Sequence, residues 1–284
     1  MDKLFVDQTG KEYTTDDVCQ VLKEIGADEC DTLFIHSDIL FGTLSKGLKR
    51  KDYLQALYDA VEQLHVTNLI IPTFTYSFCN HEDYDARNSA TSMGAFNEYI
   101  RKMPGRYRTL DPLLSLSVPE NLRETFSLPC DHSLGSDSGF DILHRMENVK
   151  FLFLGARLGN CFTYVHYVEK MLDVPYRFDM PFSGRIIDAK GAVSEKTQYI
   201  HTACYGVRPA DYYYFEDYLE QAGHLKKQRL GNLSAACISE RDAYREIAGM
   251  LKKNIHYFLE VPFREEDLVH KYTKGLDGER ITHC

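Results

Sequence analysis

The sequence predicts an α/β protein, a single α/β/α layered domain with a largely parallel central sheet and additional hairpins. Three continuous apolar runs, at residues 32–35, 68–71 and 149–156, are typical of strands covered on both faces of a sheet. An amphipathic helical pattern separates the first run from the second. A strand, a helix and a strand in this order form a βαβ unit, so these two strands are expected to be parallel with a right-handed crossover.

Length and composition indicate one globular domain spanning residues 1–284. A chain of 284 residues can bury a substantial core, and neither an internal repeat nor a Pro/Ser-rich linker marks a boundary. The formal net charge of −9 argues against nucleic acid or an anionic membrane as a partner, and it is compatible with a cationic ligand. The tail from about residue 265 is polar, and we expect it to be loosely held.

The lack of a recognisable targeting segment and the scattered cysteines are typical of a protein in a reducing compartment. No N-terminal segment resembles a signal peptide and no apolar run reaches membrane-spanning length, so we expect a cytoplasmic protein without a membrane partner. The 8 cysteines are scattered without a Cys-x-x-Cys pair, which argues against zinc, and we expect no metal. Most of them should be small core residues, but Cys161 lies five residues before His166.

The first elements can be read from turn and cap signals. Residues 4–6 and 12–14 flank the polar turn 7–10 and predict an opening hairpin. Thr14 and Asp17 have the spacing of a capping box, and apolar residues follow at helical intervals, which predicts a helix there.

The middle of the chain alternates between patterned and irregular segments. Residues 51–64 carry an apolar stripe and supply the helix of the βαβ unit. Residues 77–91 have no strong period and predict a long loop. Ser92 then predicts the N-cap of a short helix over residues 92–101.

The later elements follow the same logic. Residues 106–115 are dense in hydrogen-bond donors and predict an irregular segment, and residues 121–145 mix a loop with a short helix. A hairpin is predicted at 185–193, around a turn-forming Asp-Ala-Lys-Gly. Helices are predicted at 210–225 and, behind a Ser-x-x-Asp cap, at 239–255.

A candidate catalytic pair follows the third apolar run. Thr163, His166 and Glu169 recur every third residue, so they share one face of the predicted helix. A histidine with a carboxylate one turn away is the smallest arrangement that provides an oriented general base near neutral pH. Alternatively, the pair is a satisfied contact on a packed helix.

The position of this pair in the predicted sheet favours a site. In open α/β sheets, ligands bind beyond the carboxyl ends of the strands. The segments that follow the three apolar runs, 36–43, 72–75 and 157–163, are polar and would meet at one rim. Hydroxyl groups from Ser37 and Thr43, together with backbone amides at the helix end, could hold a phosphate or an oxyanion there.

Several segments resemble the antibiotic N-acetyltransferase family, whose named members are the aminoglycoside 3-N-acetyltransferases. They occur in the family's order between about residue 30 and about residue 200, and each is weaker alone than the ordered set. The matching segments are His36-Ser37 with Phe41-Gly42, Pro72-Thr73-Phe74-Thr75, Ser92-Met93-Gly94-Ala95-Phe96, the stretch from Arg108 to Ser115, and Thr163-x-x-His166-x-x-Glu169 before Val174-Pro175-Tyr176.

The resemblance implies a fold and an activity. The family has a single α/β/α unit, distinct from the common acetyltransferase fold, and transfers an acetyl group from acetyl-CoA to an amine of an amino sugar. Acetyl-CoA would be the co-substrate, and the acceptor a small molecule such as an aminoglycoside, whose acetylation is an antibiotic-resistance reaction. A homodimer stays open.

The resemblance also implies roles for individual residues. His166 matches the general base, Glu169 the carboxylate beside it, and Thr163 opens the same motif. The predicted CoA-binding residues are His36, Ser37, Phe41, Gly42, Thr43, Thr73, Thr75 and Arg108. The predicted acceptor-binding residues are Asp111 and Tyr76, together with Asp83 and Asp85. The two loop carboxylates would attract a polycationic sugar, or alternatively lie on a solvated loop.

One position departs from the family pattern. Relatives usually read Arg-Ser-x-His-Pro where this chain has Arg108-Thr109-Leu110-Asp111-Pro112. An aspartate thus replaces a histidine in the cleft, which leaves the acceptor more open than the acyl donor. A nucleotide-linked amino sugar used in surface-polysaccharide synthesis is the alternative acceptor.

The expected mechanism is direct attack. An ammonium group has no lone pair, so His166 would take a proton from the acceptor amine as it attacks the thioester. Thr163, Ser37 or backbone amides would stabilise the oxyanion. Two other classes stay open, a cysteine hydrolase or amidase that uses Cys161 with His166, and a non-catalytic protein that binds CoA or a sugar.

Overall fold

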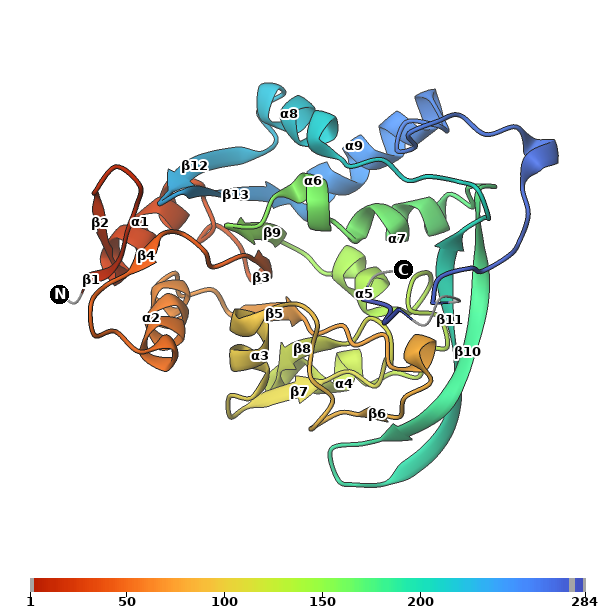
Figure 1. Ribbon diagram of the computed structural model, residues 1–284, viewed down its shortest axis with the longest axis horizontal. Coiled ribbons are helices and arrows are strands. Elements are labelled where there is room, and N and C mark those ends of the chain that lie inside the picture. The colour runs from red at the N-terminus through yellow and green to blue at the C-terminus, as the bar shows by residue number, and fades with distance from the viewer. Residues whose placement is uncertain (1–2, 276–278, 283–284) are drawn as a thin grey trace.

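A seven-stranded sheet with strand order β12-β13-β9-β3-β5-β8-β7 forms the centre of the computed structural model, which describes residues 3–275 and 279–282 (Figure 1). The three predicted apolar strands are neighbours in its middle, and both of their pairings are parallel. These strands are β9 (Val149–Leu154), β3 (Thr32–Ser37) and β5 (Asn68–Pro72). The α/β prediction and the βαβ unit are confirmed.

The outer strands of this sheet are antiparallel, so the sheet is mixed and parallel only in its centre. The prediction of an irregular segment at 106–115 is wrong at its start, because residues 106–108 pair with the strand that follows. The two edges are hairpins formed by β7 (Arg106–Arg108) with β8 (Leu116–Pro119) and by β12 (Lys226–Leu230) with β13 (Leu233–Ser239). Strand β12 was not predicted, because its residues are mostly exposed and polar and so carry no hydrophobic pattern.

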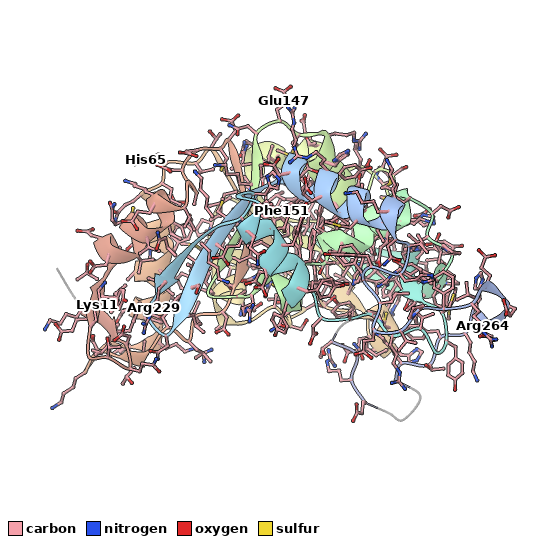
Figure 2. All side chains as sticks on the ribbon, turned by 90° about the horizontal axis from the view of Figure 1, so that it is seen from above. Lys11, His65, Glu147, Phe151, Arg229 and Arg264 are labelled. Atoms are coloured by element: carbon pink, nitrogen blue, oxygen red, sulfur yellow. The ribbon has the colours of Figure 1, made fainter. Side chains whose placement is uncertain are left out.

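Helices cover both faces of the sheet, as an α/β/α layering requires. Along β9, Phe151 and Phe153 face one hydrophobic cluster, whereas Leu152 and Leu154 face the other. Figure 2 shows Phe151 in the middle of the molecule. The first cluster is closed by α5 (Gly139–Arg145), α7 (Tyr164–Met171) and α9 (Glu240–Lys253), and the second by α1 (Thr15–Glu24), α2 (Arg50–Glu62) and α3 (Ala95–Arg101).

Helix ends test the cap predictions. The capping box of Thr14 with Asp17 is confirmed at the start of α1. Ser92 is not an N-cap, because α3 begins three residues later behind Gly94, whose φ is +94°. The Ser92 hydroxyl donates instead to the carbonyl of Phe74, which fixes this segment on the end of β5.

Helix α8 (Tyr213–Gln221) is shorter than the predicted helix at 210–225. The backbone N–H of Tyr212 donates to the carbonyl of Gly159, and that of Ala210 donates to Phe258. These hydrogen bonds hold residues 210–212 in the connection before the helix rather than in the helix itself.

Two smaller sheets flank the centre. One contains β1 (Lys3–Val6), β2 (Glu12–Thr14) and β4 (Thr43–Leu44), which confirms the opening hairpin. The other is a long hairpin arm, β10 (Arg177–Ile187) with β11 (Val193–Ala203), which curves past the lower part of the molecule in Figure 1. The predicted turn at residues 188–191 is confirmed, but both strands are much longer than expected.

The predicted loop at 77–91 is tethered to this arm. Strand β6 (Tyr84–Asp85) pairs in parallel with β10, and a 3₁₀ turn covers Phe78–Asn80. The remaining short elements are α4 (Arg123–Phe126), α6 (Leu158–Cys161) and 3₁₀ turns at Glu120–Leu122 and Glu265–Asp267.

The described part of the C-terminal tail contacts the rest of the chain. Val269 forms a β-bridge with Tyr205, and Ile281 is buried with its backbone bonded to Asn80. Residues 276–278 and 283–284 of the predicted loose tail lie outside the described residues. No helix in the described ranges is both long and apolar enough to cross a membrane.

We predict that Gly155→Ala is strongly destabilising. Gly155 follows β9 with φ +77°, and an added Cβ would lie 1.9 Å from the backbone oxygen of Asp38. We expect the free energy of unfolding to fall by about 3 kcal/mol or more, measured by urea denaturation. The control is Gly249→Ala in α9, where a Cβ meets nothing within 4 Å, with an expected gain of about 0.5–1 kcal/mol. Equal stabilities of the two variants would contradict the close packing of Gly155 on the backbone of Asp38.

Candidate active site

The candidate base lies on a short helix that starts at the rim of the sheet. After β9 the chain turns at Gly155, forms α6, and enters α7 through Thr163. His166 and Glu169 lie one turn apart on α7, and Nδ1 of His166 is 2.7 Å from Oε2 of Glu169. The helical spacing has therefore brought the imidazole and the carboxylate into direct contact.

Glu169 is buried and held by three partners. Besides His166, the hydroxyl of Tyr176 donates to Oε1 at 2.7 Å, and Nε of Arg177 forms an ion pair with Oε2 at 2.7 Å. Burial alone would raise the pKa of Glu169, but the charge of Arg177 and the two hydrogen bonds outweigh it and lower the pKa to about 2. The carboxylate is therefore ionised, with hydrogen bonds to Tyr176 and His166 and an ion pair with Arg177.

These contacts define the state of His166. An ionised carboxylate only accepts hydrogen bonds, so Nδ1 of His166 carries the proton and Nε2 keeps its lone pair. Burial and the charge of Arg177 lower the pKa of His166 to about 4, although Glu169 acts in the opposite direction. The imidazole is therefore neutral near pH 7, with its side chain 17% exposed.

A cavity of about 420 Å³, here the His166 cavity, contains this imidazole. Thr163 and Tyr76 line it, and Thr163 makes no capping hydrogen bond to α7. A second histidine, His201 from β11, also lines it and has Nδ1 3.0 Å from Oδ1 of Asp179. Burial lowers the pKa of His201 as well, so both imidazoles of the cavity are neutral.

A neighbouring cavity of about 400 Å³, here the His36 cavity, lies at the carboxyl ends of the parallel strands. His36 and Ser37 line it from β3, Asn97 lines it from α3, and Cys161 lines both this cavity and the His166 cavity. The Ser37 hydroxyl donates to Oδ1 of Asn97 at 2.6 Å. His36 stacks on Phe153, and burial lowers the pKa of His36 to about 3.

Phe41, Gly42 and Thr43 are not among the residues that line the His36 cavity. Phe41 is fully buried and stacks on Phe5, and a Cβ at Gly42 would lie 2.3 Å from the carbonyl oxygen of Val6. Thr43 pairs with Val6 between β4 and β1. In this structure these residues fasten the loop after β3 to the first hairpin, and their contact with CoA stays a prediction.

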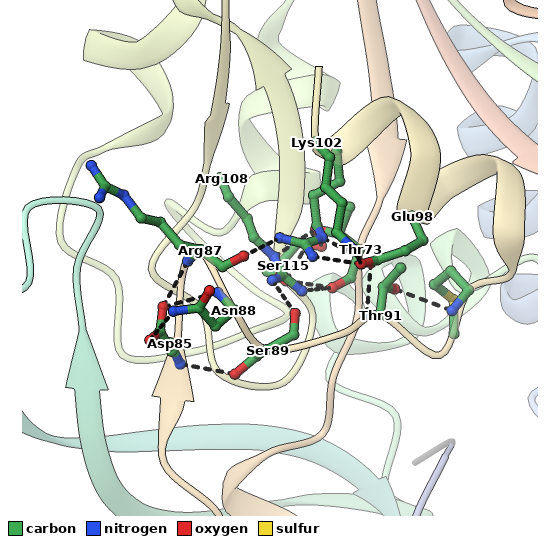
Figure 3. Close-up of polar contacts among 12 residues, drawn as sticks. Thr73, Asp85, Arg87, Asn88, Ser89, Thr91, Glu98, Lys102, Arg108 and Ser115 are labelled. Atoms are coloured by element: carbon green, nitrogen blue, oxygen red, sulfur yellow. Dashed lines mark hydrogen bonds and ion pairs between the residues drawn. The ribbon is translucent and has the colours of Figure 1, made fainter. Parts of the chain in front are cut away.

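Thr73, Thr75 and Arg108 are buried and bonded to the protein itself. Arg108 donates to the carbonyls of Thr73 and Ser89, each at 2.6 Å, and its Nε lies 3.2 Å from the hydroxyls of Thr73 and Ser115 (Figure 3). Thr75 donates to a carbonyl of the loop that follows β7. The three side chains therefore tie the end of β5 to β7 and to the loops around it.

Asp111 lies in a different cavity, of about 330 Å³, and among the described lining residues Leu114 alone also lines the His166 cavity. Its Oδ1 accepts from the backbone N–H groups of Leu113 and Leu114 and from the hydroxyl of Ser133. Burial raises the pKa of Asp111. The family-departing residue is thus bonded into a turn, on the far side of Leu114 from His166.

The other two predicted acceptor-binding carboxylates, exposed Asp83 and half-buried Asp85, are engaged locally. Asp83 forms an ion pair with Arg185 of the hairpin arm at 2.6 Å. Asp85 accepts from the backbone N–H groups of Arg87 and Asn88 and closes a turn. Of the four predicted acceptor-binding residues, only Tyr76 lines the cavity that contains His166.

Cys161 does not have the surroundings of a nucleophile. Its Sγ donates to the carbonyl of Arg157 at 3.2 Å, and burial, with the nearby charge of Glu216, raises the pKa of the thiol. Nδ1 of His166 is already occupied by Glu169. Within residues 3–275 and 279–282, no group of three or more His, Cys, Asp or Glu side chains is arranged to hold a metal ion.

Arg177 and His201 are not among the predicted site residues, and Tyr176 belongs to a family-like segment without a predicted role. Tyr176 ends that segment and Arg177 follows it directly, so a signal was present, but nothing local connects their side chains to Glu169. His201 resembles any surface or packing histidine until β11 places it opposite α7.

Comparisons with known proteins identify the lineage of this site. The family model described as aminoglycoside 3-N-acetyltransferase matches residues 35–252. Aminoglycoside N(3)-acetyltransferase III from Salmonella and from Enterobacter cloacae are each 34% identical over 110 residues, which is 37% of this chain and 36% of the relative. The chain thus matches about a third of the length of these curated relatives.

Solved structures of low sequence identity share the fold. The apoenzyme of aminoglycoside acetyltransferase AAC(3)-IVa has a TM-score of 0.70 at 19% identity, over 91% of this chain and 95% of its own. A mutant of the same enzyme in complex with a gentamicin scores 0.70 at 18%, over 89% and 93%. AAC-IIIb in a binary complex with CoASH scores 0.67 at 17%, over 89% and 99%.

We predict that Arg108→Met lowers stability rather than CoA affinity alone. Loss of the buried guanidinium leaves the carbonyl of Ser89 without its donor and removes one of two donors to the carbonyl of Thr73, which keeps the Ser115 hydroxyl. The free energy of unfolding should therefore fall by about 2–4 kcal/mol. The control is Arg87→Met at an exposed side chain, with an expected change within about 0.5 kcal/mol. Chemical denaturation measures both. A normal stability with a raised KM for acetyl-CoA would show that Arg108 contacts CoA instead.

Proposed function

Because this chain belongs to the aminoglycoside 3-N-acetyltransferase family, we propose that it is an acetyl-CoA-dependent N-acetyltransferase that acts on an amine of an amino sugar. The observation that carries the proposal is the His166–Glu169 contact, which leaves a neutral imidazole nitrogen facing a cavity next to the strand ends. The solved AAC-IIIb complex with CoASH and the AAC(3)-IVa complex with a gentamicin support the two substrate classes.

His166 is the general base of the proposed reaction. The amine attacks the thioester carbonyl while Nε2 of His166 takes its proton, and Glu169 stabilises the imidazolium that forms. Arg177 and Tyr176 hold the carboxylate in the orientation that this requires. They are positioning residues, because they act through Glu169.

The two cavities suit the two substrates. The thioester would lie toward the His36 cavity, against Ser37 and His36 at the ends of β3, and the acceptor amine in the His166 cavity. Cys161 borders both cavities, so the reacting groups would meet near it. Thr163, whose hydroxyl does not cap α7, is the proposed donor to the oxyanion of the tetrahedral intermediate.

A cysteine hydrolase is the weaker alternative. It needs a thiolate and an imidazole in contact, whereas here the thiol of Cys161 has a raised pKa and donates to a backbone carbonyl. Direct transfer needs no covalent intermediate on the enzyme.

The first test of the proposal measures thiol release from acetyl-CoA with a panel of amines, for the parent and three variants. His166→Gln should lower kcat by about 10²- to 10⁴-fold, because no base then accepts the proton. Glu169→Gln should also lower kcat strongly, because the neutral amide neither fixes the tautomer nor stabilises the imidazolium. Cys161→Ala is the matched control and should keep most of the activity.

Either of two outcomes would contradict the proposal. If no amine causes release of free thiol from acetyl-CoA, the proposed acetyltransferase activity is wrong. Loss of activity in Cys161→Ala, with inactivation of the parent by a thiol alkylator in the absence of CoA, would favour the hydrolase.

The second test follows pH. With a pKa of about 4, His166 is neutral between about pH 5 and pH 8, so its protonation should not limit kcat/KM in this range. The fall of kcat/KM toward acid should instead track the amine, and it should move when acceptors of different amine pKa are compared. An inflection that stays near 6.5 for every acceptor would assign the titration to an unperturbed His166.

A further inference from the structure

A small cavity with a cationic lining adjoins the His166 cavity. This cavity, here the Arg177 cavity, has a volume of about 140 Å³ and shares Pro209 and Lys274 with the His166 cavity. Lys271, Lys274 and Arg177 line it, together with the hydroxyl-bearing Thr202. Among the described residues that line it, none is an aspartate or a glutamate.

Glu169 balances the charge of Arg177, so the positive charge of this lining comes from Lys271 and Lys274, and it is opposite in sign to the protein as a whole. The chain has 42 Asp and Glu residues against 33 Lys and Arg, with a formal net charge of −9. The acidic residue among those that line the His166 cavity is Asp211, and Lys274 lies in the same wall. A polycationic acceptor would therefore meet Lys274 as well as Asp211 in the His166 cavity, whereas an anion would meet only positively charged residues among the described lining of the Arg177 cavity.

Lys271 is held in place by the fold. Val269 bridges to Tyr205 at the end of β11, and the ammonium of Lys271 lies 5.4 Å from the centre of the Tyr205 ring. In Figure 1 the chain after α9 returns beside the ends of β10 and β11. The tail thus delivers two cations to the same strand ends that present Arg177 and His201.

We propose that the acceptor is an amino compound that also carries a phosphate or a carboxylate, and that this anion binds in the Arg177 cavity while the amine faces His166. The inference rests on the proposed N-acetyltransferase function and specifies its acceptor. It favours an anionic amino sugar over a polycationic aminoglycoside.

Arg177 gives this arrangement a fixed geometry. Its Nε pairs with Glu169, its Nη1 donates to the carbonyl of His201 at 3.2 Å, and Arg177 is also one of the residues that line the Arg177 cavity. A single rigid guanidinium therefore connects the carboxylate behind the base with the proposed anion site. An acceptor anchored there would hold its amine at a defined distance from His166.

The test compares acceptors that differ mainly in charge, with thiol release as the readout. The acceptors are glucosamine, glucosamine 6-phosphate, a uridine-diphosphate-linked amino sugar, muramic acid and kanamycin. We expect at least one phosphate- or carboxylate-bearing acceptor to have a kcat/KM at least about tenfold above that of glucosamine and of kanamycin. Comparison of the phosphate and carboxylate arms shows which anion the cavity takes.

Variants then assign the effect to the cavity. Lys271→Met and Lys274→Met should each raise the KM for the best anionic acceptor by about tenfold, with kcat and the KM for acetyl-CoA unchanged. Lys274→Glu should lower kcat/KM for the anionic acceptor and raise it for kanamycin. The matched control is Lys11→Met, at the distant N-terminal hairpin, which should leave kcat and both KM values unchanged.

Two results would overturn the inference while leaving the acetyltransferase function intact. Kanamycin as the best acceptor, with no effect of the lysine variants, would show that the cavity does not select for an anion. A raised KM for acetyl-CoA in the lysine variants would show that the cavity holds a CoA phosphate instead. Absence of thiol release with every amine would contradict the function itself.

Discussion

The buried ion pair between Glu169 and Arg177 is the interaction on which the rest of the site depends. Both side chains are almost fully enclosed, at 1% and 2% exposure, so each charge is stabilised by the other rather than by water. The pair joins α7 to the first residue of β10, and Tyr176 adds a hydrogen bond to the same carboxylate. The orientation of His166 therefore depends on the hairpin arm as well as on its own helix.

The parallel centre of the sheet supplies the second constraint. Strands β9, β3 and β5 end at the same rim, where the polar segments that follow them form the His36 and His166 cavities. Because Gly155 packs directly on the backbone of Asp38, the chain can leave β9 close enough to β3 for Cys161 to border both cavities. The closeness of the two cavities is thus a consequence of strand register and of one glycine.

Several family-like residues serve the architecture of this site rather than its surface. Arg108 and Thr73 use their polar atoms to tie β5 to β7, and Phe41 packs in the core beneath the loop after β3. A sequence motif does not distinguish a residue that touches a ligand from one that shapes the loop around it. Asp111 is the residue at which this chain departs from the family pattern. It bonds to Ser133 and to a backbone turn, in the cavity that lies on the far side of Leu114 from His166.

Local pattern by itself determined the three central strands, the capping box at Thr14 and the His166–Glu169 contact, because each depends on residues within one turn or one strand. The edge hairpin at 226–239 and the pairing of residues 106–108 lay beyond such patterns, since exposed polar strands carry no hydrophobic signal. Only the tertiary structure placed His201 beside the base and gathered Arg177 with Lys271 and Lys274, from distant parts of the chain. Charge and hydrophobic periodicity describe neighbouring residues and therefore predict single helices and strands. A cavity depends on which distant segments pack together, and no local pattern records that.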